Sequence, residues 1–274
     1  MDPQLVRLVE LVRGNRVAVL TGAGCSTESG IPDYRGQGAP PRTRPAIQHR
    51  EFVDHAHVRQ RYWARSMLGW PRFARARPND AHHALAMLEQ RDRLAGIITQ
   101  NVDGLHHAAG SAGVVELHGA LARVRCLGCH AITTRDDLQA RLAAANRAWA
   151  ARVTEVEVAP DGDAELPEGL IHEFTVVDCA GCGGALMPDV VMFGGNVARR
   201  TLDAAWETFE RGDVLLVVGS SLAVFSGYRF VRRAAECGMP IAIVNRGPTR
   251  GDEHAAIRLD ALAGPTLLAL AATA

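Results

Sequence analysis

Residues 17–30 read VAVLTGAGCSTESG, a short apolar run that leads directly into a glycine-rich turn. The apolar residues 17–20 predict a buried β-strand, and Gly22 and Gly24 predict a tight turn at the start of a helix. Glycines at such a place let the backbone approach a pyrophosphate, which the amides of the turn can bind. Thr27 occupies the position of the usual third glycine, so a tight turn without a ligand stays an alternative at this point.

Three more short apolar runs repeat the pattern at residues 95–99, 214–219 and 240–245, and each ends in small or polar residues. Helical stretches lie between them, and residues 5–13 place apolar side chains on one helical face. Continuous apolar strands that alternate with helices predict a parallel sheet covered on both faces. We therefore expect an α/β fold with a doubly wound, Rossmann-like sheet, whose ligand lies at the carboxyl ends of the strands.

Two stretches interrupt this alternation and predict a smaller domain. The first is rich in proline, arginine and aromatic residues, and the second contains the paired cysteines. We predict that residues 1–36, 81–119 and 188–274 form a Rossmann-like domain of the dinucleotide-binding type. Residues 37–80 would then be a helical insertion, and residues 120–187 a zinc-binding module that joins it. Within that module we expect a helix over 136–151 and an acidic loop over 159–169.

Two CxxC pairs predict a metal site. Cys126 and Cys129 form one pair, and Cys179 and Cys182 form the other. Two such knuckles complete a tetrahedral Zn²⁺ site, and four thiolates leave no position for water, so the zinc would be structural. The alternative is four free buried cysteines. Cys25, which lies in the glycine turn, is either oxidation-sensitive or a small turn residue.

The composition limits the classes of partner. The chain has 274 residues, with 30 basic and 30 acidic residues, and every basic residue is an arginine. A balanced charge argues against a protein that binds nucleic acid through bulk charge. The apolar runs are too short to span a bilayer, and no secretion signal is visible at the start of the chain. We therefore expect no specific nucleic acid, no membrane, and a reducing cytoplasm.

Four blocks of sequence together resemble one enzyme family. They are residues 22–35 (GAGCSTESGIPDYR), residues 99–106 (TQNVDGLH), the pair at 118–119 (HG) and residues 219–222 (GSSL). In this order they resemble the signature of the sirtuin (Sir2) family of NAD-dependent protein deacylases. Residues 59–65, 159–163, 226–230 and 247–250 further resemble class II sirtuins, the group of mitochondrial sirtuin-4-like and bacterial members.

The resemblance implies NAD as cofactor, one structural Zn²⁺, and a set of site residues. His118 would be the catalytic base that deprotonates a ribose hydroxyl, with His106 and His107 as less favoured candidates, and a neutral imidazole suits that role. Asn101 and Asp103 would act with it in catalysis. The cofactor would contact Gly22, Ala23, Gly24, Ser26, Ile31, Pro32, Asp33, Tyr34, Arg35, Gln100, Asn101, Asp103, Gly219, Ser220, Ser221, Asn245, Arg246, Gly247 and Ala263.

An apolar, strand-like run follows the second cysteine pair. It consists of Val190, Val191, Met192, Phe193 and Gly194. The plain interpretation is a core strand. The resemblance implies instead an edge that pairs with an extended substrate peptide by strand addition. The expected partners are therefore acylated-lysine proteins or peptides.

The favoured function is removal of acetyl or other acyl groups from protein lysines, yielding nicotinamide and O-acyl-ADP-ribose. Two alternatives stay open, protein mono-ADP-ribosylation at the same site and a zinc-ribbon module that senses NAD without turnover. The acyl preference is also open. Tyr62 and Arg65 resemble the pair that reads acidic acyl groups in desuccinylating sirtuins, and an arginine can grip a carboxylate with two hydrogen bonds.

Overall fold

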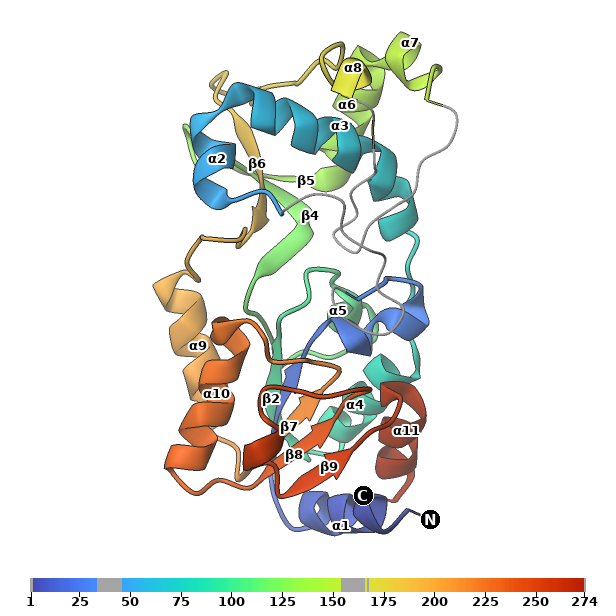
Figure 1. Ribbon diagram of the computed structural model, residues 1–274, viewed down its shortest axis with the longest axis vertical. Helices are drawn as coiled ribbons and strands as arrows, with labels where there is room; N and C mark the ends of the chain where they lie inside the picture. The colour runs from blue at the N-terminus through green and yellow to red at the C-terminus, as the bar shows by residue number, and fades with distance from the viewer. Residues whose placement is uncertain (1, 34–45, 154–165, 167, 274) are drawn as a thin grey trace. The chain divides into compact units, whose positions relative to one another are not determined.

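The computed structural model describes residues 2–33, 46–153, 166 and 168–273 (Figure 1). The chain divides into two compact units. The first comprises Met1–Ala39, Arg77–His118 and Val197–Ala274, and the second comprises Pro40–Ala76 and Gly119–Asn196. No helix in the described part of the chain combines the length and the apolar character that crossing a bilayer requires.

The first unit is built on a parallel sheet of six strands. Their spatial order is β3 (Val114–Glu116), β2 (Leu94–Thr99), β1 (Val17–Thr21), β7 (Val214–Val218), β8 (Ile241–Val244) and β9 (Ile257–Leu259). The four strands expected from the apolar runs are confirmed. The two edge strands were missed, because each has three residues and carries no long apolar run.

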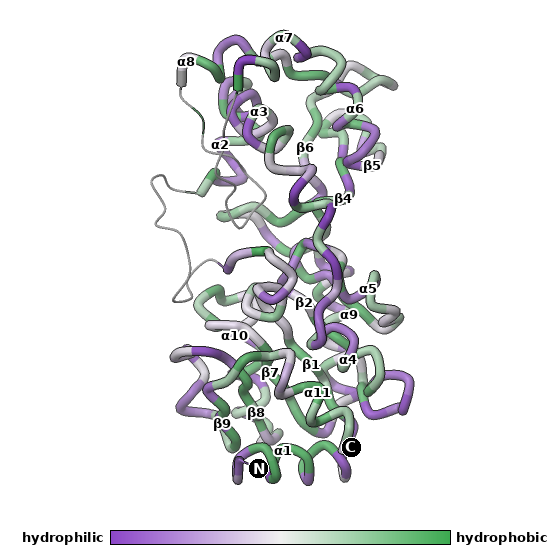
Figure 2. Tube along the Cα trace, turned by 90° about the vertical axis from the view of Figure 1, so that its right-hand side faces the viewer, coloured by the Kyte–Doolittle hydropathy of each residue, from purple (hydrophilic) through white to green (hydrophobic). Residues whose placement is uncertain are grey.

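Helices cover both faces of this sheet. Helices α1 (Pro3–Arg13), α4 (Asp80–Gln90) and α11 (Ala263–Thr273) pack on one face, and α9 (Arg199–Glu210) and α10 (Phe225–Glu236) pack on the other (Figure 1). Successive residues of a strand point to opposite faces, so Leu216 and Val218 belong to the first cluster while Leu215 and Val217 belong to the second. This explains why the strands are continuously apolar, as the green tubes of β1, β7 and β8 show in Figure 2. The predicted doubly wound sheet is confirmed.

The strand order reverses between β1 and β7. From β1 the chain proceeds to β2 and β3 on one side, and β7 is followed by β8 and β9 on the other. In open α/β sheets, ligands bind outside the carboxyl ends of the strands at such a switch point. The glycine turn follows β1, and Gly219 follows β7. The two candidate cofactor loops thus start from neighbouring strands.

The second unit contains a small antiparallel sheet and a group of helices. The sheet order is β5 (Ile132–Thr134), β4 (Gly119–Cys126) and β6 (Leu186–Val190). The helices are α2 (His49–Asp54), α3 (Ala56–Phe73), α6 (Arg135–Ala145), α7 (Arg147–Ala150) and α8 (Glu168–Ile171). Trp63, Leu142 and Phe174 lie in their common core, so the helical insertion and the cysteine-bearing segment fold together.

Three local expectations need correction. The helix expected over 136–151 is broken into α6 and α7 at Asn146, whose side chain bonds to the backbone of Leu142 and of Thr175 instead. The acidic loop expected over 159–169 lies mostly outside the described residues, and its last two residues belong to α8. The strand expected over 190–194 is β6 and ends at Val190, while Phe193 forms one isolated parallel bridge with Gln48.

Candidate functional site

The glycine turn after β1 packs closely against the loop after β7. The N–H of Gly24 donates to the carbonyl of Gly219 at 2.8 Å, and that of Gly22 donates to Val218 at 3.0 Å. A Cβ atom at Gly24 would lie 2.9 Å from the carbonyl oxygen of Gly219, and one at Gly22 would lie 2.8 Å from Cβ of Ser220. Larger residues would force the two loops apart, so the glycines are required by backbone approach.

A buried polar network follows this turn. The side-chain amide of Asn101 donates to the carbonyl of Gly22 at 3.1 Å and to Oγ of Ser26 at 3.0 Å. The hydroxyl of Ser26 in turn donates to Asp103 at 2.7 Å, and the N–H of Leu105 donates to the other carboxylate oxygen at 2.9 Å. Burial raises the pKa of Asp103, and these hydrogen bonds oppose the shift. The network joins the ends of β1 and β2 into one polar surface.

Gln100 and Asn245 brace the neighbouring loops. The amide of Gln100 donates to Oγ of Ser220 at 2.7 Å, which links the end of β2 to the end of β7. Asn245 follows β8, and its amide donates to the carbonyls of Arg246 at 2.8 Å and of Gly247 at 3.0 Å. Both side chains therefore fix loops at the edge of the sheet where the strands end.

His118 has a defined tautomer. Its Nδ1 lies 2.9 Å from the carbonyl oxygen of Gln100, and a carbonyl can only accept, so Nδ1 carries the proton. Its Nε2 lies 2.7 Å from Oγ of Ser226 and therefore accepts the hydroxyl proton of that serine. Part of the ring reaches the surface, yet burial lowers the pKa of His118, and the hydrogen bond to Gln100 opposes the shift. The result is a neutral imidazole whose Nε2 carries the lone pair.

The other residues predicted to contact the cofactor lie in three places: beyond the glycine turn, in the loop after β7 and in α11. Ile31 is buried and Pro32 and Asp33 are half-buried beyond the turn, whereas Tyr34 and Arg35 lie outside the described residues. The carbonyl of Ser221 accepts from the N–H of Arg250. Ala263, expected to contact the cofactor, is buried at the first position of α11 and packs in the core of the first unit.

Two residues at this edge were missed by sequence reasoning. Ser226 was quoted only as part of a motif, although its hydroxyl contacts His118. The carboxylate of Glu28 accepts from the N–H of Gly264 at 2.9 Å, close to the start of α11, where a negative charge interacts favourably with the helix dipole. The partner of Glu28 is 236 residues away in the chain, so no local pattern could have indicated this contact.

The residues at the strand ends suit NAD. A pyrophosphate needs close backbone approach at a switch point, which the glycine turn supplies. In addition, Oγ of Ser29 is buried and has no hydrogen-bond partner among the described residues. Unsatisfied buried hydroxyls are costly and call for a partner. The donor set therefore fits a polar, phosphate-bearing ligand.

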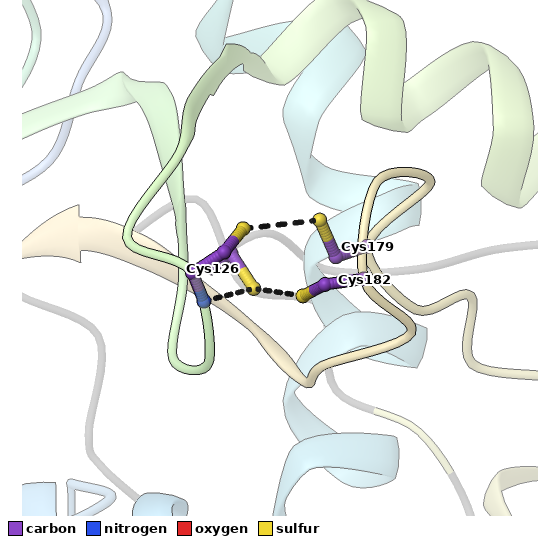
Figure 3. Close-up of side chains that lie close together, drawn as sticks. Cys126, Cys179 and Cys182 are labelled. Atoms are coloured by element: carbon purple, nitrogen blue, oxygen red, sulfur yellow. Dashed lines mark hydrogen bonds between the residues drawn. The ribbon is translucent and has the colours of Figure 1, made fainter.

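The four predicted metal ligands come together in the second unit. Their sulfur atoms all lie within 4.8 Å of one another, with 3.4 Å between Cys126 and Cys182 and 3.8 Å between Cys129 and Cys179. Figure 3 shows Cys126 and Cys182 pointing toward each other, with Cys179 on the same loop as Cys182. Thiolates around one tetrahedral Zn²⁺ are about 3.8 Å apart, given Zn–S bonds of about 2.3 Å.

Backbone groups support the first of these thiolates. The N–H groups of Cys129 and Gly128 donate to Sγ of Cys126, and these bonds lower its pKa to about 6. A deprotonated thiol is the form that binds metal. The cluster thus fits Zn²⁺ in ligand type and in spacing.

The residues predicted to bind the peptide, 190–194, follow the second cysteine pair in the sequence and begin at the last residue of β6. Val190 pairs with Gly119 at the start of β4. Beyond it, the carbonyl of Phe193 accepts from the N–H of His49 at 2.8 Å. Phe193 remains exposed, with 40% of its surface accessible.

Comparison with known proteins extends this description. Residues 22–226 match the Sir2 family. NAD-dependent protein deacetylase 1 of Streptomyces coelicolor is 49% identical over 267 residues, which cover 97% of this chain and 89% of that protein. NAD-dependent protein deacylase SIR4 of Monosiga brevicollis is 50% identical over 245 residues, covering 88% of this chain and 79% of that protein.

Solved structures agree with these sequence matches. A Sir2 protein solved in a study of the mechanism and regulation of Sir2 enzymes has a TM-score of 0.76 at 28% identity, and the match covers 100% of this chain and 98% of that one. A Sir2 protein solved with a p53 peptide and NAD⁺ has a TM-score of 0.75 at 28% identity, covering 95% and 94%.

Proposed function

This chain belongs to the Sir2 family, and on that premise we propose that it is an NAD-dependent protein-lysine deacylase. It removes acetyl or other acyl groups from protein lysines and yields nicotinamide and O-acyl-ADP-ribose. NAD and one structural Zn²⁺ are its cofactors. The family relationship at about half identity over nearly the whole chain supports the enzyme class.

The orientation of His118 is the observation that carries the mechanism. NAD supplies an electrophilic ribose carbon and nicotinamide as the leaving group. We assign the role of general base to His118, because Nδ1–H is held by the carbonyl of Gln100 and Nε2 is left with its lone pair. A positioned base of this kind contributes about 10²- to 10⁴-fold to a rate. Because burial lowers the pKa of His118, the ring stays neutral and can accept a proton.

Asn101 and Asp103 hold the polar surface on which the reaction proceeds. The amide of Asn101 and the carboxylate of Asp103 both bond to Ser26, so the three side chains are fixed relative to one another. We assign to them, with Gln100 and Ser220, the binding of carboxamide and hydroxyl groups, for which amide and carboxylate groups are suited. Preorganised polar groups need little reorganisation during the reaction.

The zinc has a structural role in this proposal. Four thiolates complete its coordination, so no position is left for water or substrate. It stabilises the loops that carry the two cysteine pairs. The residues after β6, Val190–Gly194, are the proposed docking edge for an extended acyl-lysine peptide, through main-chain hydrogen bonds. Class II membership and a cytoplasmic location belong to the same proposal.

The test uses NAD labelled in the adenosine half, the zinc-loaded full chain and an acetyl-lysine peptide. Deacylation predicts label in a soluble O-acyl product and nicotinamide release that depends on the acylated peptide. His118→Ala should lower turnover by about 10²-fold or more while zinc content and circular dichroism stay unchanged. Label retained on a target protein without a soluble product would establish ADP-ribosylation instead, and nicotinamide release independent of acyl-lysine would refute deacylation.

A further inference from the structure

A second group of metal-ligand side chains lies inside the first unit, apart from the four cysteines. Cys25, His82 and His106 each offer one ligand atom, and these atoms lie within 4.8 Å of one another. Relative exposures are 0% for Cys25, 0% for His82 and 2% for His106. The residues come from the glycine turn, from α4 and from α5 (Leu105–Ala108), so the fold itself assembles them.

One ring nitrogen of His106 makes no hydrogen bond to the part of the chain that the structure describes. The hydroxyl of Thr21 donates to Oγ1 of Thr99 at 2.8 Å, so the oxygen of Thr21 accepts from Nε2–H of His106 at 2.9 Å. Nδ1 then carries a lone pair. It is buried and has no hydrogen-bond partner among the described residues. A buried polar atom left in this way is costly, and a bound cation would offset that cost.

His82 is oriented by a similar outer contact. Its Nδ1 lies 2.9 Å from Oδ1 of Asn79, an acceptor, so Nδ1 carries the proton. A longer contact of 3.3 Å from the N–H of Asn79 to the same atom would need the opposite tautomer and is the weaker of the two. Nε2 has one contact at 3.5 Å with Oγ of Ser26, whose own proton goes to Asp103. Nε2 of His82 therefore also keeps its lone pair.

These two histidines match a recurring design of metal sites. A ligating imidazole usually donates its second N–H to an oxygen, which fixes the ring and the tautomer. Asn79 provides that oxygen for His82, and Thr21 provides it for His106. Burial lowers the pKa of His82 to about 4 and that of His106 to about 3, so both rings are neutral, as ligands must be.

We propose that Sγ of Cys25, Nε2 of His82 and Nδ1 of His106 form a second metal site, which takes a thiophilic cation of low coordination number, Cu(I). On binding, the S–H bond of Cys25 breaks, its proton leaves to solvent, and an S–Cu bond forms without a change of oxidation state. Two ligand atoms of one ion lie at most about 4.3 Å apart, the sum of typical bonds of about 2.3 and 2.0 Å. Three ligand atoms around one ion lie about 3.5–3.7 Å apart, so separations of up to 4.8 Å need to contract by up to about 1.3 Å.

Charge and burial favour Cu(I) over Zn²⁺ here. One thiolate and a monovalent ion are neutral together, so binding adds no net charge to a fully buried group of ligands, where net charge is costly. Soft thiolate ligands select Cu(I), and imidazole suits copper as well. Zn²⁺ with three protein ligands keeps a water in its fourth position, whereas these three side chains are 0–2% exposed.

The test is anaerobic titration of the zinc-loaded full chain with Cu(I) held by a competing chelator of known affinity. Bound copper and retained zinc are measured together, and X-ray absorption reports the ligands of copper. We expect one Cu(I) per chain with zinc retained, a shell of one sulfur and two nitrogens, and one proton released. No uptake, uptake matched by zinc loss, or an all-sulfur shell would overturn the proposal.

Variants separate this site from the zinc cluster. Cys25→Ala should weaken Cu(I) binding by at least about 100-fold, whereas Cys237→Ala, which removes an exposed cysteine elsewhere, should leave it unchanged. Thr21→Val removes the outer contact of His106 while preserving size and should weaken binding by about 10- to 100-fold. Zinc content and circular dichroism confirm folding of each variant. Unchanged copper affinity in folded Cys25→Ala would refute the site, whatever the outcome of the deacylation assay.

Discussion

Nε2 of His118 lies 2.7 Å from Oγ of Ser226, and the two residues are 108 positions apart in the chain. Because Nδ1–H is engaged by the carbonyl of Gln100, the serine must be the donor and the imidazole the acceptor. The hydroxyl of Ser226 thus donates to the same Nε2 lone pair that the proposed mechanism uses to accept a proton. It lies in the first turn of α10, which packs on the sheet, so the contact is held by a rigid element.

Removing this donor should change the basicity of His118. A hydrogen bond donated to the neutral ring favours the neutral form, so Ser226→Ala should raise the pKa of His118 by up to about one unit, as expected for a bond worth about 1 kcal/mol. NMR titration of the histidine resonances measures the shift. Ser226→Thr retains a hydroxyl and serves as the control. A pKa of His118 that is the same in Ser226→Ala and in the wild type would contradict the assigned contact.

The pH dependence of deacylation follows from the lowered pKa of His118. Burial shifts this pKa below the ordinary histidine value of 6.5, so the neutral base persists as the pH falls through 6.5. We expect kcat/KM to stay level from pH 8 to about 6.5 and then to fall about tenfold per unit below the shifted pKa. The same shift adds stability that is present above pH 6.5 and is lost as the pH falls through the folded-state value. An acid limb centred above 6.5 in the pH–rate profile would argue against His118 as the base.

The close approach of the two cofactor loops predicts a sharp effect of one methyl group. Gly24→Ala places Cβ 2.9 Å from the carbonyl oxygen of Gly219, so the loops must separate. We expect a loss of stability of about 1–3 kcal/mol together with weaker NAD binding, measured by urea unfolding and calorimetry. Gly14→Ala is the matched control, because its Cβ would meet nothing closer than 4.0 Å. Equal NAD affinity in both variants would show that the turn does not contact the cofactor.

Much of the fold could be predicted because its signals are local. The strands β1, β2, β7 and β8 are continuous apolar runs, since each is buried on both faces of a parallel sheet. The cysteine pairs were equally visible, because two ligands three residues apart occupy one knuckle. The glycines of the turn revealed a close approach, although the partner loop was not identifiable from the pattern.

Other features depend on contacts between distant segments. Helix α6 ends where the amide of Asn146 bonds to Thr175, 29 residues away, a contact that the local sequence pattern does not show. The strand predicted at 190–194 is shorter than its apolar residues suggested, because Phe193 pairs with Gln48 instead. The group of Cys25, His82 and His106 was invisible for the same reason, since its members come from three separate segments. Burial of Cys25 raises the pKa of its thiol, which argues against an oxidation-sensitive thiolate.

Loss of one zinc ligand should disrupt the second unit selectively. Cys126 is at the end of β4 and its backbone pairs with Leu186 of β6, so loss of the metal should loosen the pairing of these two strands. Cys126→Ala should therefore lose zinc and become sensitive to proteolysis within Gly119–Asn196. Cys237→Ala changes an exposed cysteine outside the cluster and should retain one zinc per chain. Zinc release assays and limited proteolysis provide the comparison, and full zinc retention in Cys126→Ala would contradict the four-thiolate site.

Tyr62 should act through packing, and this bears on the acyl preference. Its ring packs edge-on against those of Phe52 and Trp63, with ring centroids 5.3 Å and 4.9 Å apart. The residue is 8% exposed and belongs to the core of the second unit. A side chain held in this way is poorly placed to read an acidic acyl group, in contrast to half-buried Arg65.

Tyr62→Phe preserves the ring, so we expect an unchanged ratio of kcat/KM for succinyl and acetyl peptides, whereas Tyr62→Ala should lose about 3–5 kcal/mol of stability. A kinetic panel of acetyl, succinyl, glutaryl and lipoyl peptides with urea unfolding tests both statements. A succinyl preference in the wild type that disappears in Tyr62→Phe, with stability retained, would assign the hydroxyl to acyl recognition and refute the packing role.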